Sequence, residues 1–208
     1  MPLALVTCGP AHEPIDDVRR ITNHSTGELG TILSKALHAG GFHVLCLRGE
    51  MATHPVPPNV EVIPFSTNSS LGEELEKLPE APAVIFHAAA LCDFTVDAGS
   101  ASGKKIRSHA ELTLTLRPAE KILPRLRPLF NEALIVGWKY ELEGTRADAL
   151  ARARSQISHA RTDACVVNGA AYGEGFGLVE SDSPDVLHFA DKTALSIHLA
   201  QWAQEKQG

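Results

Sequence analysis

AVIFHAAA, residues 83–90, is a nearly unbroken apolar run that ends in three alanines. ALIVGW (133–138) and DACVVN (163–168) are two further runs of the same kind. Strands that do not alternate apolar with polar residues are expected where helices cover both faces of a parallel sheet. The three segments therefore predict buried strands at the centre of a three-layer α/β fold.

Segments with helical spacing lie between the strand-like runs. Apolar residues recur at this spacing from Gly27 to Ala39, after which Gly40 and Gly41 stop the helix. Strands and helices that alternate along the chain, joined by right-handed crossovers, predict a doubly wound and mostly parallel sheet. We expect a single domain over residues 1–208. Further strands are expected at 2–7, 42–47 and 60–65, and further helices at 70–78, 122–130, 145–159 and 192–204.

ELTLTLRP (111–118) has a different pattern, because its apolar and polar residues alternate strictly. Such alternation is typical of an antiparallel strand with one face in solvent. We therefore expect an extended β flap around residues 95–117.

The composition narrows the class of partner and the compartment. The net charge of −6 argues against a nucleic acid or a membrane surface, because both usually require a basic face. No apolar run approaches the roughly 20 residues that span a bilayer, and we see no signal peptide. The four cysteines lie in or beside apolar runs without metal-ligand spacing, which favours reduced, buried thiols. We expect a cytoplasmic protein.

The loop after the first strand, TCGPAHEPIDDVRRITNHSTGELG (7–30), is a candidate phosphate site. Ligands of α/β folds bind at the carboxyl ends of strands, and the free N–H groups at a helix N-terminus favour an anion. Ser25, Thr26 and Gly27 stand where the helix begins. An ordinary helix cap made by Ser25 or Thr26 is the alternative.

HAAALCDF (87–94) and GKKIRS (103–108) also carry polar side chains that suit a ligand. Asp93 follows a strand and three small residues, so it would accept hydrogen bonds from a base, a ribose or a lysine; capping a loop is the alternative. Lys105 and Arg107 share one face if this segment is a strand. They fit either an anion or the protection of an exposed sheet edge.

VGWKYELEG (136–144) and VVNGAAYGEGFG (166–177) follow two further buried strands. Gly137 permits close backbone approach, Trp138 offers a face for stacking and Lys139 adds a charge. The alternative is a core tryptophan beside a solvated lysine. The glycine-rich loop after Asn168 is either a ligand-facing loop or a simple connection.

Taken together and in order, these segments resemble the phosphopantothenate–cysteine ligase family. This family is also the C-terminal half of the bifunctional DNA/pantothenate metabolism flavoprotein. The matching stretches are GPAHEPIDDVRRITNHSTGELG, HAAALCDF, KIRS followed by LTLTLRP, VGWKYE, and DACVVN before GFG. The first is the most specific, and together they cover nearly the whole chain. The resemblance implies a Rossmann-like fold whose flap forms a homodimer.

The resemblance also implies a reaction in coenzyme A biosynthesis. The carboxylate of 4′-phosphopantothenate attacks the α-phosphate of CTP or ATP, and the amine of cysteine then displaces the nucleotide monophosphate to form an amide. Mg²⁺ is expected with the nucleotide phosphates, and no protein metal site is expected. Flavin belongs to the decarboxylase half of the bifunctional protein, so none is expected here, and a separate decarboxylase would be the functional partner.

Site residues follow from the resemblance by position. Asn23 matches the asparagine that handles the acyl intermediate, Arg19 the arginine of the same loop, and Lys105 a lysine that stabilises charge on the phosphates. The nucleotide is expected to lie against Gly9, Ser25, Thr26, Gly27, Ala89, Ala90, Asp93, Gly137, Trp138 and Lys139.

Three segments depart from the family pattern, one of them being KIKK, which reads KIRS at residues 105–108. Gly9-Pro10-Ala11 replaces GGT, and the proline removes one backbone donor. Glu28 replaces the lysine of SSGK and reverses a charge. These departures favour, as an alternative, a catalytically altered relative that binds a nucleotide. An NAD(P)-dependent reductase is a third possibility, but the chain has neither a Y-x-x-x-K pair nor a G-x-x-x-G-x-G loop.

Overall fold

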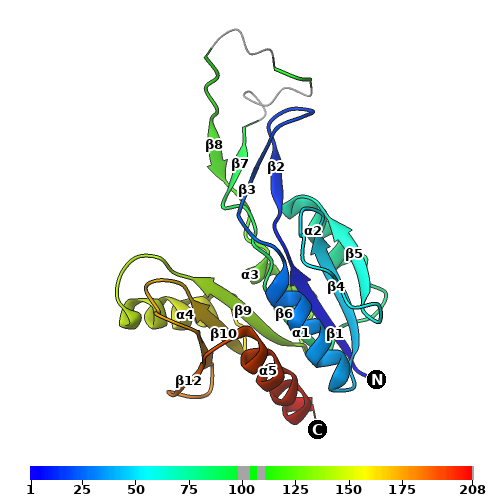
Figure 1. Cartoon of the computed structure of the whole chain (residues 1–208), viewed down its shortest axis with the longest axis vertical. Helices are drawn as coiled ribbons and strands as arrows, with labels where there is room; N and C mark the ends of the chain where they lie inside the picture. Colours follow the sequence, from blue (N-terminus) through cyan, green and yellow to red (C-terminus); the bar gives the residue numbers. More distant parts are fainter. Residues whose placement is uncertain (98–103, 107–110, 208) are drawn as a thin grey trace.

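An eight-stranded sheet forms the centre of the structure (Figure 1). The computed structural model describes residues 1–97, 104–106 and 111–207. The strand order is β12-β11-β10-β9-β6-β1-β4-β5; the strands from β10 to β5 are parallel, and β11 and β12 extend the sheet antiparallel. This order confirms the predicted doubly wound, mostly parallel sheet. The strands are β1 (Leu3–Cys8), β4 (His43–Gly49), β5 (Glu61–Phe65), β6 (Val84–His87), β9 (Leu134–Tyr140), β10 (Ala164–Asn168), β11 (Phe176–Glu180) and β12 (Val186–Phe189).

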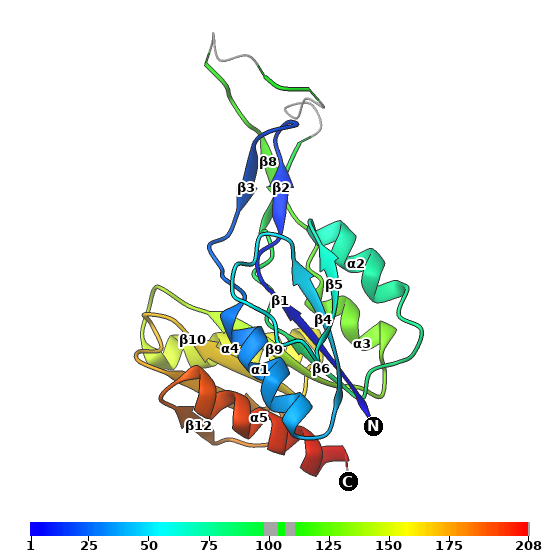
Figure 2. The ribbon, with the colours of Figure 1, turned by 45° about the vertical axis from the view of Figure 1, so that its right-hand side comes forward.

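Helices cover both faces of the sheet, as Figure 2 shows. On one face α1 (Glu28–Ala39) packs beside α5 (Lys192–Gln207). The other face is covered by α2 (Asn68–Glu76), α3 (Leu123–Leu129) and α4 (Arg146–Ala160). The sequence predicts each of these helices to within a few residues. No helix in the described part of the chain is long and apolar enough to cross a membrane.

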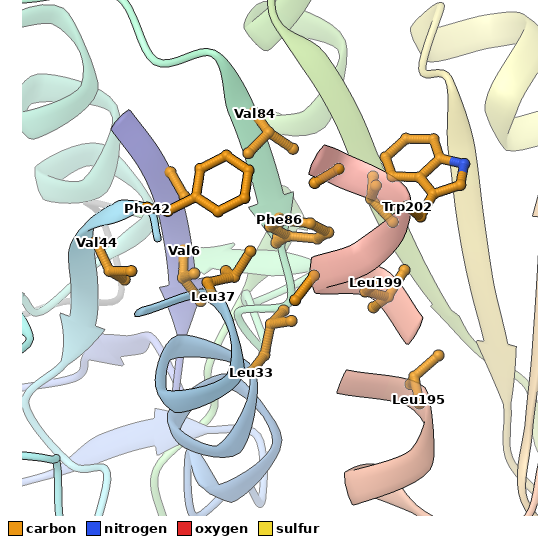
Figure 3. Close-up of a cluster of buried hydrophobic side chains, with 14 of the residues drawn as sticks. Val6, Leu33, Leu37, Phe42, Val44, Val84, Phe86, Leu195, Leu199 and Trp202 are labelled. Atoms are coloured by element: carbon orange, nitrogen blue, oxygen red, sulfur yellow. The ribbon is translucent and has the colours of Figure 1, made fainter. Parts of the chain in front are cut away.

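Alternate residues of the central strands point into two separate cores. Val6 and Phe86 pack with Leu33 of α1 and Leu199 of α5, as Figure 3 shows. Their neighbours on the strands, such as Ile85, pack on the opposite face with α2 and α3. Both faces are therefore dry, which is why the strands read as unbroken apolar runs.

Two short hairpin-like pairs form an arm that projects beyond one end of the sheet (Figures 1 and 2). Strand β2 (His12–Pro14) pairs with β3 (Arg20–Thr22), and β7 (Phe94–Val96) pairs with β8 (Leu116–Pro118), both antiparallel. The antiparallel strand predicted over 111–118 is thus shortened to its last three residues, which are all exposed. The rest of the expected flap lies partly outside the described residues, including Arg107.

One predicted strand needs correction, and two strand pairs were not predicted. The strand predicted over 83–90 ends at His87, and Ala88–Ala90 continue as a loop. The β2–β3 pair was not predicted, because its polar and proline-containing sequence lacks a strand pattern. The antiparallel edge formed by β11 and β12 was also missed, because β11 begins inside a segment that looks like a glycine-rich loop.

All four cysteines are buried free thiols, as the sequence predicts. The sulfurs of Cys8 and Cys46 are 3.4 Å apart on neighbouring strands. The strand register pairs Cys46 with Val6, so the two cysteines are offset by two residues. Strand spacing and rise then place their Cα atoms about 8 Å apart, beyond the reach of an unstrained disulfide.

Candidate functional site

A cavity of about 400 Å³ lies where strands β1, β6 and β10 end and helices α1 and α5 begin. This is the position at which α/β sheets usually bind ligands. Its lining comes from the first loop, from the loop after β6, and from the C-terminal quarter of the chain. The lining residues are Cys8, Gly9, His24, Ser25, Thr26, Gly27, Glu28, Leu29, Gly30, Ala88, Asn168, Phe176 and Lys192.

The first turn of α1 forms one wall of the cavity. Gly27 is the N-cap residue and has a left-handed backbone (φ 77°), which glycine adopts without strain. Ser25 Oγ accepts a long hydrogen bond of 3.4 Å from Gly27 N, and Thr26 Oγ1 accepts one of 3.3 Å from Glu28 N. Neither Ser25 nor Thr26 is the N-cap residue of α1. The alternative prediction, an ordinary N-cap made by one of these two side chains, is therefore wrong.

Glycines allow this wall to approach the sheet. A Cβ at Gly30 would lie 2.2 Å from Cys8 Cβ, so α1 contacts the end of β1 almost through backbone alone. A Cβ at Gly49 would lie 2.2 Å from the carbonyl oxygen of Pro10. Gly30 and Cys8 both line the cavity, so a larger residue at position 30 would displace this wall.

Glu28 and Lys192 form an ion pair at the cavity. Glu28 is the first residue of α1 and Lys192 the first of α5, 164 positions later. Their side chains are 39% and 40% exposed, so the pair is half in solvent. The hydrogen bond and the charge of Lys192 hold the pKa of Glu28 below its usual value. The charge reversal at position 28 thus has a partner that sequence reasoning did not anticipate.

A buried threonine–histidine pair supports the loop after β6. Ala89 N donates a hydrogen bond of 3.3 Å to Thr7 Oγ1, and Thr7 Oγ1 lies 2.8 Å from His87 Nδ1. The Thr7 hydroxyl therefore joins the backbone of the loop after β6 to the buried ring of His87. Burial lowers the pKa of His87 to about 4.

The low pKa of His87 predicts a pH-dependent stability. An unfolded histidine has a pKa of 6.5, so the folded protein loses stability as the pH falls from 6.5 towards 4. Between pH 7.5 and pH 4.5 this group should lower the free energy of unfolding by about 2–3 kcal/mol. Urea unfolding of the wild type and His87→Gln at both pH values measures it. Equal losses in the two proteins would contradict this role.

The three residues predicted to be catalytic lie on or beside the arm. Asp16 Oδ2 accepts from Arg19 Nη1 (2.8 Å) and from the backbone N–H of Ile106 (2.9 Å). Arg19 Nη2 donates to the carbonyl oxygen of Ile106 (3.2 Å). These bonds, with those from its own loop, lower the pKa of Asp16. Arg19 is therefore held next to Lys105, which is exposed.

Asn23 lies between the arm and the cavity. Its amide Nδ2 donates a hydrogen bond of 2.7 Å to the carbonyl oxygen of Leu91, and its side chain is exposed. His24, the next residue, lines the cavity. Asn23 is therefore the neighbour along the chain of a residue that lines the cavity. Arg19 and Lys105 lie instead where Asp16 and Arg19 bond to the backbone of Ile106.

Four of the ten predicted nucleotide-binding residues line the cavity, two lie directly beside its lining and four lie elsewhere. Gly9, Ser25, Thr26 and Gly27 line the cavity. Ala89 and Ala90 follow its lining residue Ala88 and bond to Thr7 and Gly9. The remaining four lie outside the lining: Asp93 pairs with Lys121, Gly137 packs near Leu123 and Gln156, Trp138 packs against the α1–α5 core, and Lys139 pairs with Glu141. Their nucleotide contacts stay predictions.

Sequence reasoning missed several lining residues. Asn168 was noted as a strand end before a glycine-rich loop, and its position was the available signal. Lys192 carried no local signal, because only the packing of α5 beside α1 brings it to the cavity. Phe176 was hidden in the glycine-rich segment.

Comparison with known families places the chain. The sequence model of the DNA/pantothenate metabolism flavoprotein C-terminal domain matches residues 3–204. The chain belongs to this family. A coenzyme A biosynthesis bifunctional protein CoaBC from Thermococcus kodakarensis is 33% identical over 86% of the chain and 43% of its own length. A cysteine/cysteine sulfinic acid decarboxylase from an unknown prokaryotic organism is 33% identical over 83% of the chain and 47% of its own length. The chain thus spans less than half the length of these relatives.

Solved structures of the family share the fold. The DNA/pantothenate metabolism flavoprotein from Streptococcus pneumoniae has a TM-score of 0.80 at 24% identity, covering 100% of this chain and 98% of that one. The C-terminal domain of a CoaBC protein has a TM-score of 0.81 at 19% identity, with 99% and 96% coverage. A Cab2 variant in complex with phosphopantothenate-cysteine has a TM-score of 0.80 at 18% identity, with 99% and 86% coverage. At these identities the likeness shows the fold.

Proposed function

We propose that the protein is a phosphopantothenate–cysteine ligase of coenzyme A biosynthesis that uses CTP or ATP. The observation that carries this proposal is the cavity at the first turn of α1, in a chain that belongs to this family. Backbone N–H groups at a helix N-terminus suit phosphate. The names of the CoaBC relatives and of the Cab2 complex support the choice of substrates.

The proposed reaction has two displacements. A carboxylate oxygen of 4′-phosphopantothenate attacks the α-phosphorus of the nucleotide, the bond to the bridging oxygen breaks, and pyrophosphate leaves. The amine of cysteine then attacks the acyl carbon of the acyl-nucleotidylate. Nucleotide monophosphate leaves, the nitrogen loses a proton, and an amide remains. Cations near the phosphates and exclusion of water from the mixed anhydride would assist both steps.

The chain's own groups would act as follows. The first turn of α1 would hold phosphates, Lys105 would neutralise charge developing on them, and Asn23 with Arg19 would orient the acyl intermediate. Among the described residues no group of three or more His, Cys, Asp or Glu side chains could hold a metal. We propose that Mg²⁺ arrives on the nucleotide phosphates.

We propose a homodimer that forms through the arm. Val18, Phe94 and Leu116 lie on or near its strands and are 60%, 52% and 43% exposed. Apolar side chains gathered on a projecting element are typical of a protein interface. A separate decarboxylase would act on the product.

The proposed function predicts acid-dependent release of pyrophosphate. The purified protein is incubated with Mg²⁺ and 4′-phosphopantothenate, with CTP and ATP in separate reactions, each with and without cysteine. Pyrophosphate release that requires the acid, followed by amide and nucleotide monophosphate when cysteine is added, is expected with one nucleotide. Folded protein that releases none with either nucleotide would contradict the proposal.

A catalytically altered nucleotide-binding relative is the second candidate. The observation that favours it is Pro10, which lacks an N–H and lies buried beside the cavity loop, where its carbonyl meets Gly49. Nucleotide binding without pyrophosphate release would favour this candidate. Oxidation of NADPH by a carbonyl substrate would favour a reductase, and release of carbon dioxide from cysteine would favour a decarboxylase.

A further inference from the structure

Four residues with titratable side chains line the cavity, namely Cys8, His24, Glu28 and Lys192, and the last two are paired with each other. Lys192 Nζ donates a hydrogen bond to Glu28 Oε2. The pair is part of the cavity wall, so it lies where an anion held by the first turn of α1 would lie. Any such anion meets the Lys192 cation and the Glu28 anion together.

The position of Lys192 on its own helix is unfavourable in isolation. It is the first residue of α5, where the positive end of the helix dipole disfavours a cation. The backbone N–H groups of Thr193 and Ala194 in the first turn of α5 both donate to Asp191 Oδ1, each at 2.8 Å. Lys192 therefore contributes nothing to capping α5, and its ammonium is directed to Glu28 and the cavity instead.

Glu28, by contrast, lies at a favourable position on its helix. A carboxylate in the first turn of α1 is favoured by the same dipole that would bind a phosphate there. The carboxylate of Glu28 therefore already offsets part of the positive potential that the first turn of α1 would present to an anionic ligand. Both side chains of the pair are half exposed. If a phosphate replaces Glu28 as the partner of Lys192, the solvation of the charged groups therefore changes little.

We propose that Lys192 is a phosphate-binding residue that exchanges Glu28 for a phosphate group of the ligand, and that Glu28 is an internal competitor which weakens this binding. The proposal deepens the proposed function, since it rests on a polyphosphate ligand in this cavity. Lys192 supplies from α5 the cation that the first loop lacks at position 28. Binding of the ligand then ties α5 to α1 through phosphate in place of carboxylate.

The test is a titration of inorganic triphosphate, and of CTP and ATP with Mg²⁺, into wild type, Lys192→Gln, Glu28→Gln and the double variant by calorimetry. Lys192→Gln should weaken triphosphate binding about tenfold or more, because a charge-assisted contact is lost. Glu28→Gln should tighten it about threefold to tenfold, because a like charge is removed. Lys192→Arg should restore most of the affinity, and thermal unfolding checks that each variant is folded.

Lys206→Gln is the matched control, because Lys206 lies on the same helix but pairs with Asp182 and Glu180 away from the cavity. It should leave triphosphate binding unchanged. Wild-type affinity in Lys192→Gln, weaker binding in Glu28→Gln, or no binding of triphosphate to the wild type would each overturn the proposal. The ligase proposal fails separately, when nucleotide binds as described but no pyrophosphate is released and no amide forms.

Discussion

Replacing Lys105 by glutamine is expected to lower the rate of acid-dependent pyrophosphate release by about 10²–10³-fold, the usual effect of removing one group that stabilises transition-state charge. The free energy of unfolding should stay the same, because Lys105 is exposed. The backbone beside it is fixed from both sides, since Ile106 donates to Asp16 and accepts from Arg19. A hydrogen-bonded backbone next to an exposed side chain suits a residue that must reach a ligand at a set position.

Kinetics of three variants separate this role from a general loss of charge. Lys105→Gln should lower kcat more than it raises KM for the nucleotide, because the contact matters most in the transition state. Asn23→Ala should instead slow the cysteine-dependent step, so acyl-nucleotidylate accumulates. Lys77→Gln, an exposed lysine paired with Glu74 on α2, should change neither step. Unchanged rates in both Lys105→Gln and Asn23→Ala would disprove these assignments.

Replacing Gly30 by alanine is expected to be the most damaging small change in the cavity. Alanine favours a helix over glycine by about 1 kcal/mol, yet its Cβ would lie 2.2 Å from Cys8 Cβ. Helix α1 must move away from β1, and overpacking of this kind costs about 1–3 kcal/mol or more. We expect a lower free energy of unfolding in urea, together with loss of triphosphate binding measured by calorimetry, because the moved helix forms the cavity wall.

Gly41→Ala is the control for this prediction. Gly41 has a left-handed backbone (φ +86°), but a Cβ there meets nothing within 4 Å. It should cost about 1–2 kcal/mol through backbone strain alone and leave triphosphate binding intact. Adding Cys8→Gly to Gly30→Ala should recover part of the lost affinity, because it removes the clashing atom. A Gly30→Ala protein with wild-type stability and binding would show that α1 tolerates the shift.

The central strands could be predicted because burial on both faces requires apolar residues along their whole length. Val84, Ile85 and Phe86 face two helical layers in turn, so each must be apolar. The arm was predicted only in outline, since ELTLTL alternates but just Leu116–Pro118 pair with another strand. Strand β2 contains Glu13 and Pro14, which are poor strand formers, and its pairing with β3 is set by the loop that closes them.

The candidate site was predictable where it is local and hidden where it is not. Ser25, Thr26 and Gly27 mark the start of α1 by residue type alone, and all three line the cavity. Trp138 offered a stacking face by composition, but the structure packs it against the α1–α5 core. Lys192 gave no signal, because a contact between the first and last helices depends on the finished fold.

The same long-range contact has a consequence for how the protein is made. Leu195, Leu199 and Trp202 of α5 cover the face of the sheet on which α1 lies, and Gln207 reaches back to the carbonyl oxygen of Ala83 beside β1. The loop over residues 7–30 is translated well before α5, yet α5 supplies part of the wall of the cavity. Until α5 has been translated, that face of the sheet stays open to water, so the complete cavity can form only after α5 has been made.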